Sequence, residues 1–197
     1  MESTITYFDK PGPANTEATL NLARERANAL GIQQIIVASS TGDTAIKAID
    51  VFQGMRVIVV GLSTGPRFLD REKKEQKISQ PFSPKAKQLV EAKGGVVLIS
   101  TTVFGGMNRA FRDQLGWKAT PLSLISAALR VFGTGMKVAC EITMMAADAG
   151  LINTEEDAVA IAGVVHGADT AIVLRPVNAA LFFNLKIKEI ICKPRLG

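Results

Sequence analysis

The order of predicted helices and strands constrains the fold of this chain more than any other feature of its sequence. The predicted strands of the first half are residues 32–38, 56–62 and 96–100, and the predicted helices are residues 15–30, 43–52 and 83–93. Residues 56–62 (RVIVVGL) are almost uninterruptedly apolar, which is typical of a parallel strand buried on both faces. Strands that alternate with helices require right-handed crossovers. We therefore expect an α/β fold, a three-layer sandwich with a mostly parallel central sheet.

Two further helices are predicted in the second half, at residues 122–132 and 136–149. The first follows a capping Thr120-Pro121 and is apolar nearly all round, so we expect it to be buried. The apolar surface of residues 121–149 exceeds what one sheet face needs. A homo-oligomer interface is therefore left open.

The segment after residue 150 is compatible with two predictions. Residues 153–156 have the composition of a helix start, whereas residues 158–163 could equally form a strand. Residues 171–174 and 187–192 are clearer strands, so the chain is expected to end on a C-terminal strand. Because no linker, repeat or low-complexity tract interrupts the pattern, we expect residues 1–197 to form a single domain.

Hydrophobic residues make up 47% of the chain and charged residues 21%, which suits a sheet covered on both faces. No run approaches the ~18 apolar residues of a membrane span, and residues 1–10 do not resemble a signal peptide. The two cysteines, Cys140 and Cys192, lie in separate apolar runs. These features predict a cytoplasmic protein with no membrane partner and no disulfide framework.

The net charge of +5 raises the question of nucleic-acid binding. The positive residues are scattered, however, and the densest cluster, residues 71–75, mixes both signs. No aromatic residues are interleaved with that cluster to stack on bases. We therefore predict no nucleic-acid partner.

A polar loop follows the first strand and opens the next helix. It consists of Ser39, Ser40, Thr41, Gly42, Asp43 and Thr44. Backbone N–H groups and the positive end of a helix dipole converge at such a position, so the loop is a candidate anion site. The alternative is a simple helix cap, in which the hydroxyls satisfy backbone donors. Asp43 fits an anion site least well, because its charge opposes a phosphate unless it points away or caps the helix.

The other two strand ends are also rich in Ser, Thr and Gly. The candidates there are Ser63, Thr64, Thr101, Thr102, Phe104, Gly105 and Gly106. The carboxyl ends of parallel strands meet at one edge of a sheet, where ligands of such folds bind. Phe104 could flank a planar ring or fill the core, and Arg109 and Trp117 follow closely enough to share the region.

A polar turn between two apolar runs supplies the last candidates. It consists of His166, Gly167, Ala168, Asp169 and Thr170. The alternative to a binding role is a self-satisfied turn. His166 is the only histidine and has no carboxylate or cysteine neighbour in sequence, which argues against a catalytic base.

Lys137, Glu141 and Asp148 share one face of a predicted helix. An i,i+4 ion pair explains the first two without a ligand. The sequence contains no metal-binding Cys/His pattern, no P-loop and no nucleophile elbow. Metal-dependent, NTPase and hydrolase functions are thereby disfavoured, and no catalytic residue is assigned.

Residues 15–17, 35–45 and 56–60 together resemble the C-terminal α/β domain of pyruvate kinase, and residues 167–173 resemble a later turn of that domain. In that family both segments line an effector pocket, and the loop grips a phosphate. The family carries an arginine where this chain has Asp43, and residues 95–150 have no counterpart in it. The catalytic barrel of pyruvate kinase would need several hundred further residues, so we do not expect pyruvate kinase activity.

Nearly the whole chain is similar to stand-alone proteins built on this α/β domain alone. The matching motifs are residues 11–16, 135–142, 145–150 and 167–171. These proteins are associated with bound FMN. The resemblance therefore implies a flavin whose phosphate lies in the loop of residues 39–44, near the turn of residues 167–170.

The expected function is thus binding of a phosphate-bearing small molecule, FMN in the first place, as a small flavoprotein. Whether the chain is a flavin-dependent oxidoreductase stays open. The alternative is a module that senses a phosphorylated metabolite without catalysis. A third hypothesis is a hydrolase or lyase that uses His166 or Glu141 on a phosphorylated substrate.

Overall fold

The computed structural model describes residues 4–65, 68–69 and 77–195. The charged cluster at residues 71–75 lies outside this range. A two-stranded antiparallel ladder joins β4 (Phe68–Leu69) to β5 (Lys77–Ile78) beside the main sheet. No helix in the described ranges has the length and apolarity that a membrane crossing requires.

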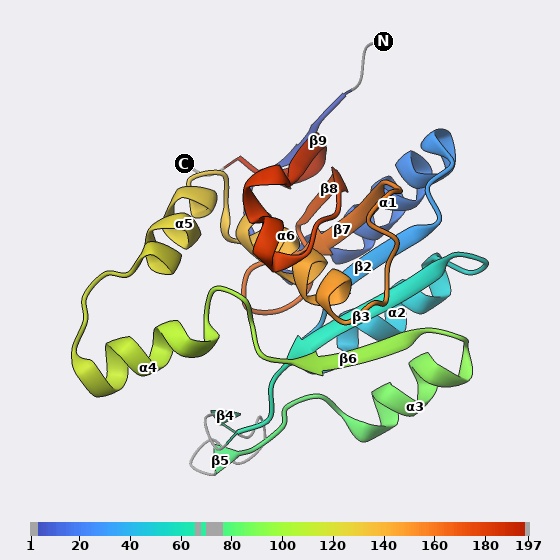
Figure 1. The fold of residues 1–197 in the computed structure, drawn as a ribbon. Helices are drawn as coiled ribbons and strands as arrows, with labels where there is room; N and C mark the ends of the chain where they lie inside the picture. Colours follow the sequence, from blue (N-terminus) through green and yellow to red (C-terminus); the bar gives the residue numbers. More distant parts are fainter. Residues whose placement is uncertain (1–3, 66–67, 70–76, 196–197) are drawn as a thin grey trace.

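A seven-stranded sheet in the order β1-β9-β8-β7-β2-β3-β6 forms the centre of the described structure (Figure 1). Its strands are β1 (Thr6–Phe8), β2 (Gln34–Ala38), β3 (Arg56–Leu62), β6 (Val96–Ser100), β7 (Ala158–Ala162), β8 (Thr170–Arg175) and β9 (Lys186–Pro194). Strands β7, β2, β3 and β6 run parallel, and only β8 is antiparallel to its neighbours. The predicted mostly parallel sheet is confirmed.

Helices cover both faces of this sheet (Figure 1). On one face lie α1 (Thr16–Leu30), α2 (Asp43–Val51) and α3 (Pro84–Ala92), and on the other lies α6 (Thr134–Asp148). The strands serve both cores by alternation: Ile35 and Val37 pack toward α1–α3, and Ile36 packs toward α6. The three-layer sandwich is confirmed.

The remaining helices lie at the rim of the sandwich. They are α4 (Gly106–Leu115), α5 (Pro121–Arg130) and the short 3-10 turns η1 (Pro13–Asn15) and η2 (Ala179–Asn184). Helix α5 begins with a capping box, in which Thr120 accepts a hydrogen bond from the Ser123 N–H and Ser123 accepts one from the Thr120 N–H. Together α4, α5 and their connection, residues 106–133, form an arm that projects from the sheet (Figure 1).

The positions of α5 and β7 test two predictions made from the sequence. The helix at residues 122–132 was expected to be buried, and this is wrong: within α5 only Ser126 is buried, because the helix packs on α6 along one narrow side. Residues 153–156 form a turn, and the alternative strand nearby exists as β7, in the middle of the sheet.

Burial controls the chemistry of both cysteines. Cys140 lies in α6 and Cys192 in β9, each is a buried free thiol, and burial raises their pKa values to about 12 and about 11. Both thiols therefore stay protonated at neutral and mildly alkaline pH. We expect a maleimide or disulfide reagent at pH 8 to label neither cysteine in native protein and both in guanidinium, as counted by intact mass. Rapid native labelling of either thiol would contradict its burial.

Candidate functional site

A cleft of about 530 Å³ opens at the carboxyl edge of the sheet. The ends of β2, β3, β6 and β7 form one side, α6 forms the floor, and the α4–α5 arm forms the opposite wall. Its volume falls in the range of roughly 300–1,000 Å³ that small-molecule sites occupy. The sheet topology therefore places the cleft where ligands of doubly wound folds bind.

More than half of the sequence-predicted site residues line this cleft. They are Ser39, Ser40, Thr41, Asp43, Thr44, Thr102, Phe104, Gly105, His166 and Gly167. The structure thus brings together the ends of β2, β6 and β7, which lie far apart in sequence.

The loop of residues 39–44 is shaped from within by Ser39. Its Oγ accepts hydrogen bonds from the N–H groups of Gly42 (3.1 Å) and Ala45 (3.4 Å), so this hydroxyl serves the loop itself. The cleft-facing hydroxyls are Ser40, Thr41 and Thr44, at the N-terminus of α2. The first N–H groups of a helix have no intrahelical acceptor, which makes this side of the cleft electropositive.

Gly42 does not line the cleft but packs against α3. Its φ of 103° lies in the left-handed region, and a Cβ there would stand 2.3 Å from the Cβ of Ala86 in α3. The loop also accepts a hydrogen bond at the Thr41 carbonyl from the Ser83 N–H, 3.0 Å away. Gly42 thus lets the loop lie against α3.

Asp43 lines the cleft, as the sequence placed it, and its carboxylate accepts a hydrogen bond from the Thr41 hydroxyl at 3.2 Å. Asp43 is the first residue of α2, where a negative charge interacts favourably with the helix dipole. The negative charge of Asp43 therefore stabilises the N-terminus of α2.

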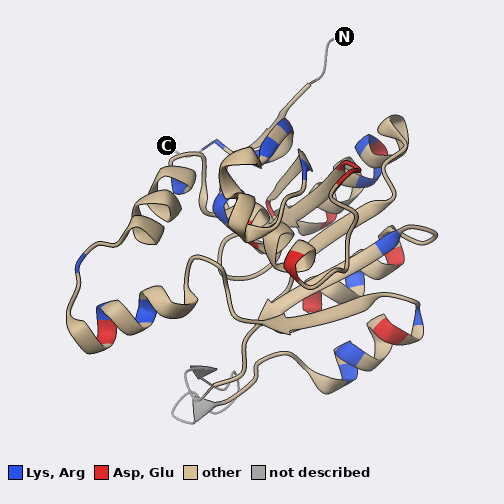
Figure 2. Ribbon diagram, in the orientation of Figure 1, with Lys and Arg blue, Asp and Glu red and all other residues tan. Residues whose placement is uncertain are grey.

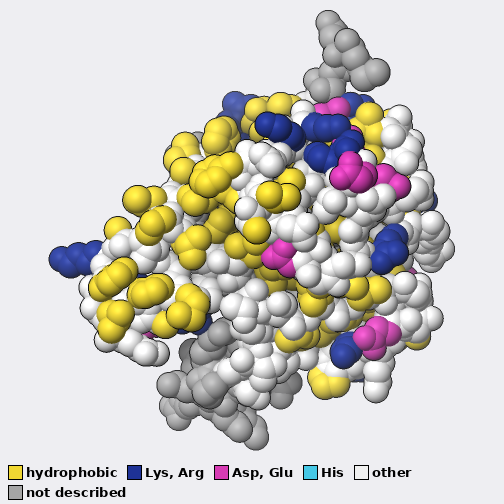
Figure 3. All heavy atoms as spheres, in the orientation of Figure 1, with side chains coloured by type: hydrophobic (Ala, Val, Ile, Leu, Met, Phe, Trp, Pro, Cys, Tyr) yellow, Lys and Arg dark blue, Asp and Glu magenta, His cyan; other side chains and the backbone are white. Residues whose placement is uncertain are grey.

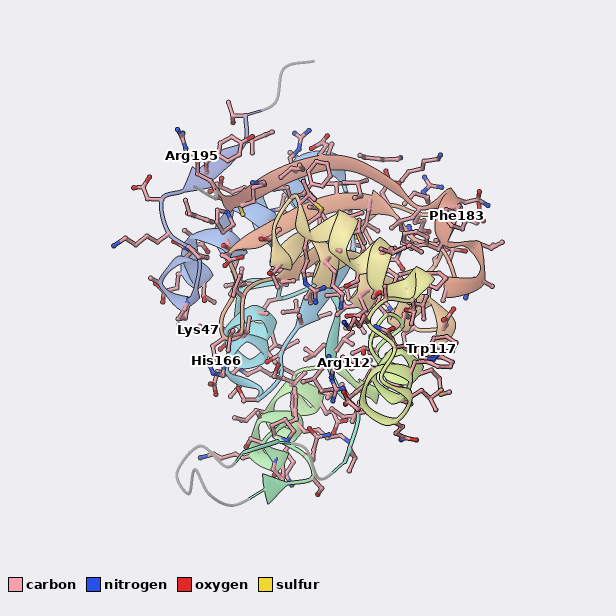
Figure 4. The ribbon with its side chains drawn as sticks, turned by 90° about the vertical axis from the view of Figure 1, so that its left-hand side faces the viewer. Lys47, Arg112, Trp117, His166, Phe183 and Arg195 are labelled. Atoms are coloured by element: carbon pink, nitrogen blue, oxygen red, sulfur yellow. The ribbon has the colours of Figure 1, made fainter. Side chains whose placement is uncertain are left out.

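The arm adds a cationic wall that the predicted site did not include. Arg112, Lys118 and Arg130 line the cleft together with Arg109, the one cation of this wall that the sequence had associated with the region. Arg112 is paired with Asp113, and this hydrogen bond raises the pKa of the guanidinium and lowers that of the carboxyl. Arg109 and Arg112 are three residues apart and lie on one face of α4, so the sequence could have predicted a cationic helix face. No local sequence pattern predicts that the arm lies over the cleft. Figure 4 shows Arg112 between Trp117 and His166.

The floor of the cleft contains a buried ion pair. Lys137 and Glu141 on α6 are bonded to each other, with 7% and 3% of their surfaces exposed. The other Glu141 oxygen accepts the Phe104 N–H at 2.8 Å, and the Lys137 ammonium lies 5.4 Å from the centre of the Phe104 ring. The pair therefore fastens the loop after β6 to α6. Asp148 takes no part, since it binds Asn178 and the Ala179 N–H.

The turn after β7 divides into two halves. His166 and Gly167 line the cleft, next to Val165, which is exposed and has a φ of 58°. Such a φ is strained for a β-branched residue, and strain of this kind concentrates at ligand sites.

The second half of the turn points into the protein. The Ala168 N–H donates to Thr16, and Asp169 accepts from the Gly12 N–H and the Thr170 hydroxyl. Ala168 and Asp169 thus bind the turn to α1 and to the start of η1.

Eight predicted site residues therefore do not line the cleft. They are Gly42, Ser63, Thr64, Thr101, Gly106, Ala168, Asp169 and Thr170. Thr64 instead accepts a hydrogen bond from Gln80, and Thr101 lies against Gly106, where a Cβ would stand 2.4 Å from the threonine methyl. Among the described residues, no three His, Cys, Asp or Glu side chains gather as a metal site.

The family model described as "Pyruvate kinase, alpha/beta domain" matches residues 17–174, a range that ends at Leu174 in β8 and leaves out β1 and β9. The matched range includes residues 95–150, for which the sequence analysis had placed no counterpart in that domain. The chain belongs to this family. The match begins in α1 and ends in β8, so the pyruvate kinase α/β domain includes the whole edge of the sheet that carries the cleft.

Proposed function

We propose that this chain binds a phosphate-bearing small molecule, FMN in the first place, in the cleft at the carboxyl edge of the sheet. The observation that carries the proposal is the combination of three surfaces around one cavity. These are the hydroxyl loop at the start of α2, the apolar side of α6, and the cationic wall of the arm.

The phosphate is proposed to bind at Ser40, Thr41 and Thr44. These residues line the cleft at a helix N-terminus, where N–H groups and hydroxyls can donate to phosphate oxygens. The strained turn at Val165 closes the same end of the cavity, beside His166 and Gly167.

A flat ring is proposed to extend from there over the floor of the cleft. Val138, Ile142 and Met145 give α6 an apolar side facing the cavity, and Trp117 lies at its rim on the arm, stacked on Phe111. Aromatic and thioether groups pack well against a conjugated ring. FMN is chosen among such ligands because it is the cofactor that the family resemblance implies.

The two separate, buried thiols suit a reducing compartment, so we place this function in the cytoplasm.

One observation favours a second candidate, a module that senses a phosphorylated metabolite without catalysis. FMN carries a single phosphate, whereas the cleft is also lined by four cations of the arm, Arg109, Arg112, Lys118 and Arg130. A ligand with anionic groups at both ends, such as a sugar bisphosphate, would use both walls.

The first test is a titration of apo protein with FMN, followed by flavin fluorescence. We expect saturable binding that Ser40→Asp weakens by at least about tenfold, or 1.4 kcal/mol, because the new charge faces the phosphate. Ser63→Asp is the matched control, since Ser63 also follows a strand but does not line the cleft. It is expected to bind FMN like the wild type.

The competing outcomes are distinct. Equal affinity of both variants would refute the phosphate position, and no FMN binding by wild-type protein would refute the flavin. Thermal stabilisation by a sugar bisphosphate but not by FMN, lost in Arg130→Ala, would establish the sensor instead. Reduction of bound flavin by NADH or NADPH would extend the proposal to an oxidoreductase.

A further inference from the structure

The arm formed by residues 106–133 is built with its polar side inward. Its four cations, Arg109, Arg112, Lys118 and Arg130, all line the cleft. Figure 2 shows Lys and Arg positions on α4, on α5 and on the connection between them. The only buried residue of α5 is a serine, Ser126, whose Oγ accepts a hydrogen bond from Arg130 at 2.6 Å, and α4 buries no residue at all. The inner side of the arm is thus the wall of a polar cavity.

The opposite side of the arm, here called the outer face, is apolar and open to solvent. It consists of Met107, Leu115, Leu124, Val131 and Phe132, each between 54% and 76% exposed, while Trp117 lies at the border between this face and the cleft. In α4, Met107, Phe111 and Leu115 recur at every fourth position and so form one stripe. This is the reverse of a surface helix in a monomer, which turns its apolar side to the core.

The outer face continues onto η2, where Leu181 and Phe183 are also exposed. Figure 3 shows apolar side chains gathered over this side of the molecule, and Figure 4 shows Trp117 and Phe183 on the same side. These seven residues expose on the order of 1,000 Å² between them, and a stable interface needs about 800 Å² from each partner. One interface of standard size would therefore cover the face.

The composition of the outer face identifies the kind of partner. Homodimer interfaces are depleted of charge and rich in aromatic residues and methionine, and this face carries two Phe and one Met. A membrane-binding face would be bordered by a cluster of Lys and Arg, whereas the four cations of the arm are all among the residues that line the cleft. We infer that a second copy of this chain covers the outer face, in a two-fold symmetric dimer that holds the arm in place over the cleft.

The test is the mass of the full chain in solution, by light scattering and sedimentation across micromolar concentrations. We expect a dimer, and we expect Leu124→Glu and Val131→Glu each to raise its dissociation constant at least a hundredfold by placing a charge in an apolar contact. Both side chains are exposed in the protomer, so the variants fold, as circular dichroism will verify. Leu89→Glu is the control, because Leu89 is an exposed leucine on α3, away from the arm.

Hydrogen exchange provides an independent measurement of the same interface. Residues 106–132 are expected to exchange faster in Leu124→Glu than in the wild type, since the arm loses its cover, while the sheet exchanges equally in both. A wild-type monomer, or a dimer that survives both arm variants as it survives Leu89→Glu, would overturn the inference. If the protein is monomeric and binds lipid vesicles through the arm, the partner of the outer face is a membrane and the dimer inference is wrong.

Discussion

Replacing Lys137 with methionine is expected to lower the free energy of unfolding by about 3–5 kcal/mol. Lys137 and Glu141 are both buried in the floor of the cleft and bonded to each other, so the substitution leaves the Glu141 charge in the protein without its counterion. Glu141→Gln is expected to cost less than Glu141→Leu, because an amide oxygen can still accept the Phe104 N–H in the loop after β6. Urea unfolding followed by circular dichroism measures each difference.

Two controls separate burial from charge. Lys87 and Glu91 form another i,i+4 pair on α3, at 3.8 Å and about half exposed, so Lys87→Met is expected to change stability by less than about 1 kcal/mol. The double variant Lys137→Met/Glu141→Leu is expected to be more stable than Lys137→Met alone, because no isolated charge remains. Equal, small effects of Lys137→Met and Lys87→Met would mean that water reaches the floor of the cleft.

Most of the main sheet was predictable from sequence because β2, β3, β6, β8 and β9 are bounded apolar runs, whereas β7 was left open between a helix and a strand. Strands β3 and β6 begin and end where the sequence placed them, at residues 56–62 and 96–100. The parallel order followed from the intervening helices. By contrast, β1 pairs with β9, from the opposite end of the chain, and no local pattern encodes a contact across that separation.

The cleft was predictable only on its sheet side. Strand ends converge by topology, so residues 39–44 and 102–105 could be grouped in advance. The cationic wall and the solvent-facing side of α5 depend on where the arm lies. An all-round apolar helix looks the same in sequence whether it lies in the core or at the rim of the fold, and the prediction of burial at residues 122–132 was wrong for this reason.

Asp169 lies next to the cleft-lining residues, so a substitution there can show whether it binds the ligand or only stabilises the turn. It was predicted as a binding residue, but it is 1% exposed and accepts hydrogen bonds from the Gly12 N–H at 2.9 Å and the Thr170 hydroxyl at 2.8 Å. Asp169→Ala is expected to lower the free energy of unfolding by about 3 kcal/mol, since both donors stay buried without an acceptor.

Asp148 offers a matched control for this variant. Its carboxylate also accepts from one backbone N–H, that of Ala179, and one side chain, that of Asn178, but it is exposed. Water can replace it there, so Asp148→Ala is expected to cost no more than about 1 kcal/mol. Urea unfolding compares the two variants, and an FMN titration of the folded fraction asks whether the ligand site has changed. Because Asp169 fastens the turn to η1 without lining the cleft, FMN affinity is expected to stay at the wild-type value. Loss of affinity at unchanged stability would instead make Asp169 a ligand contact.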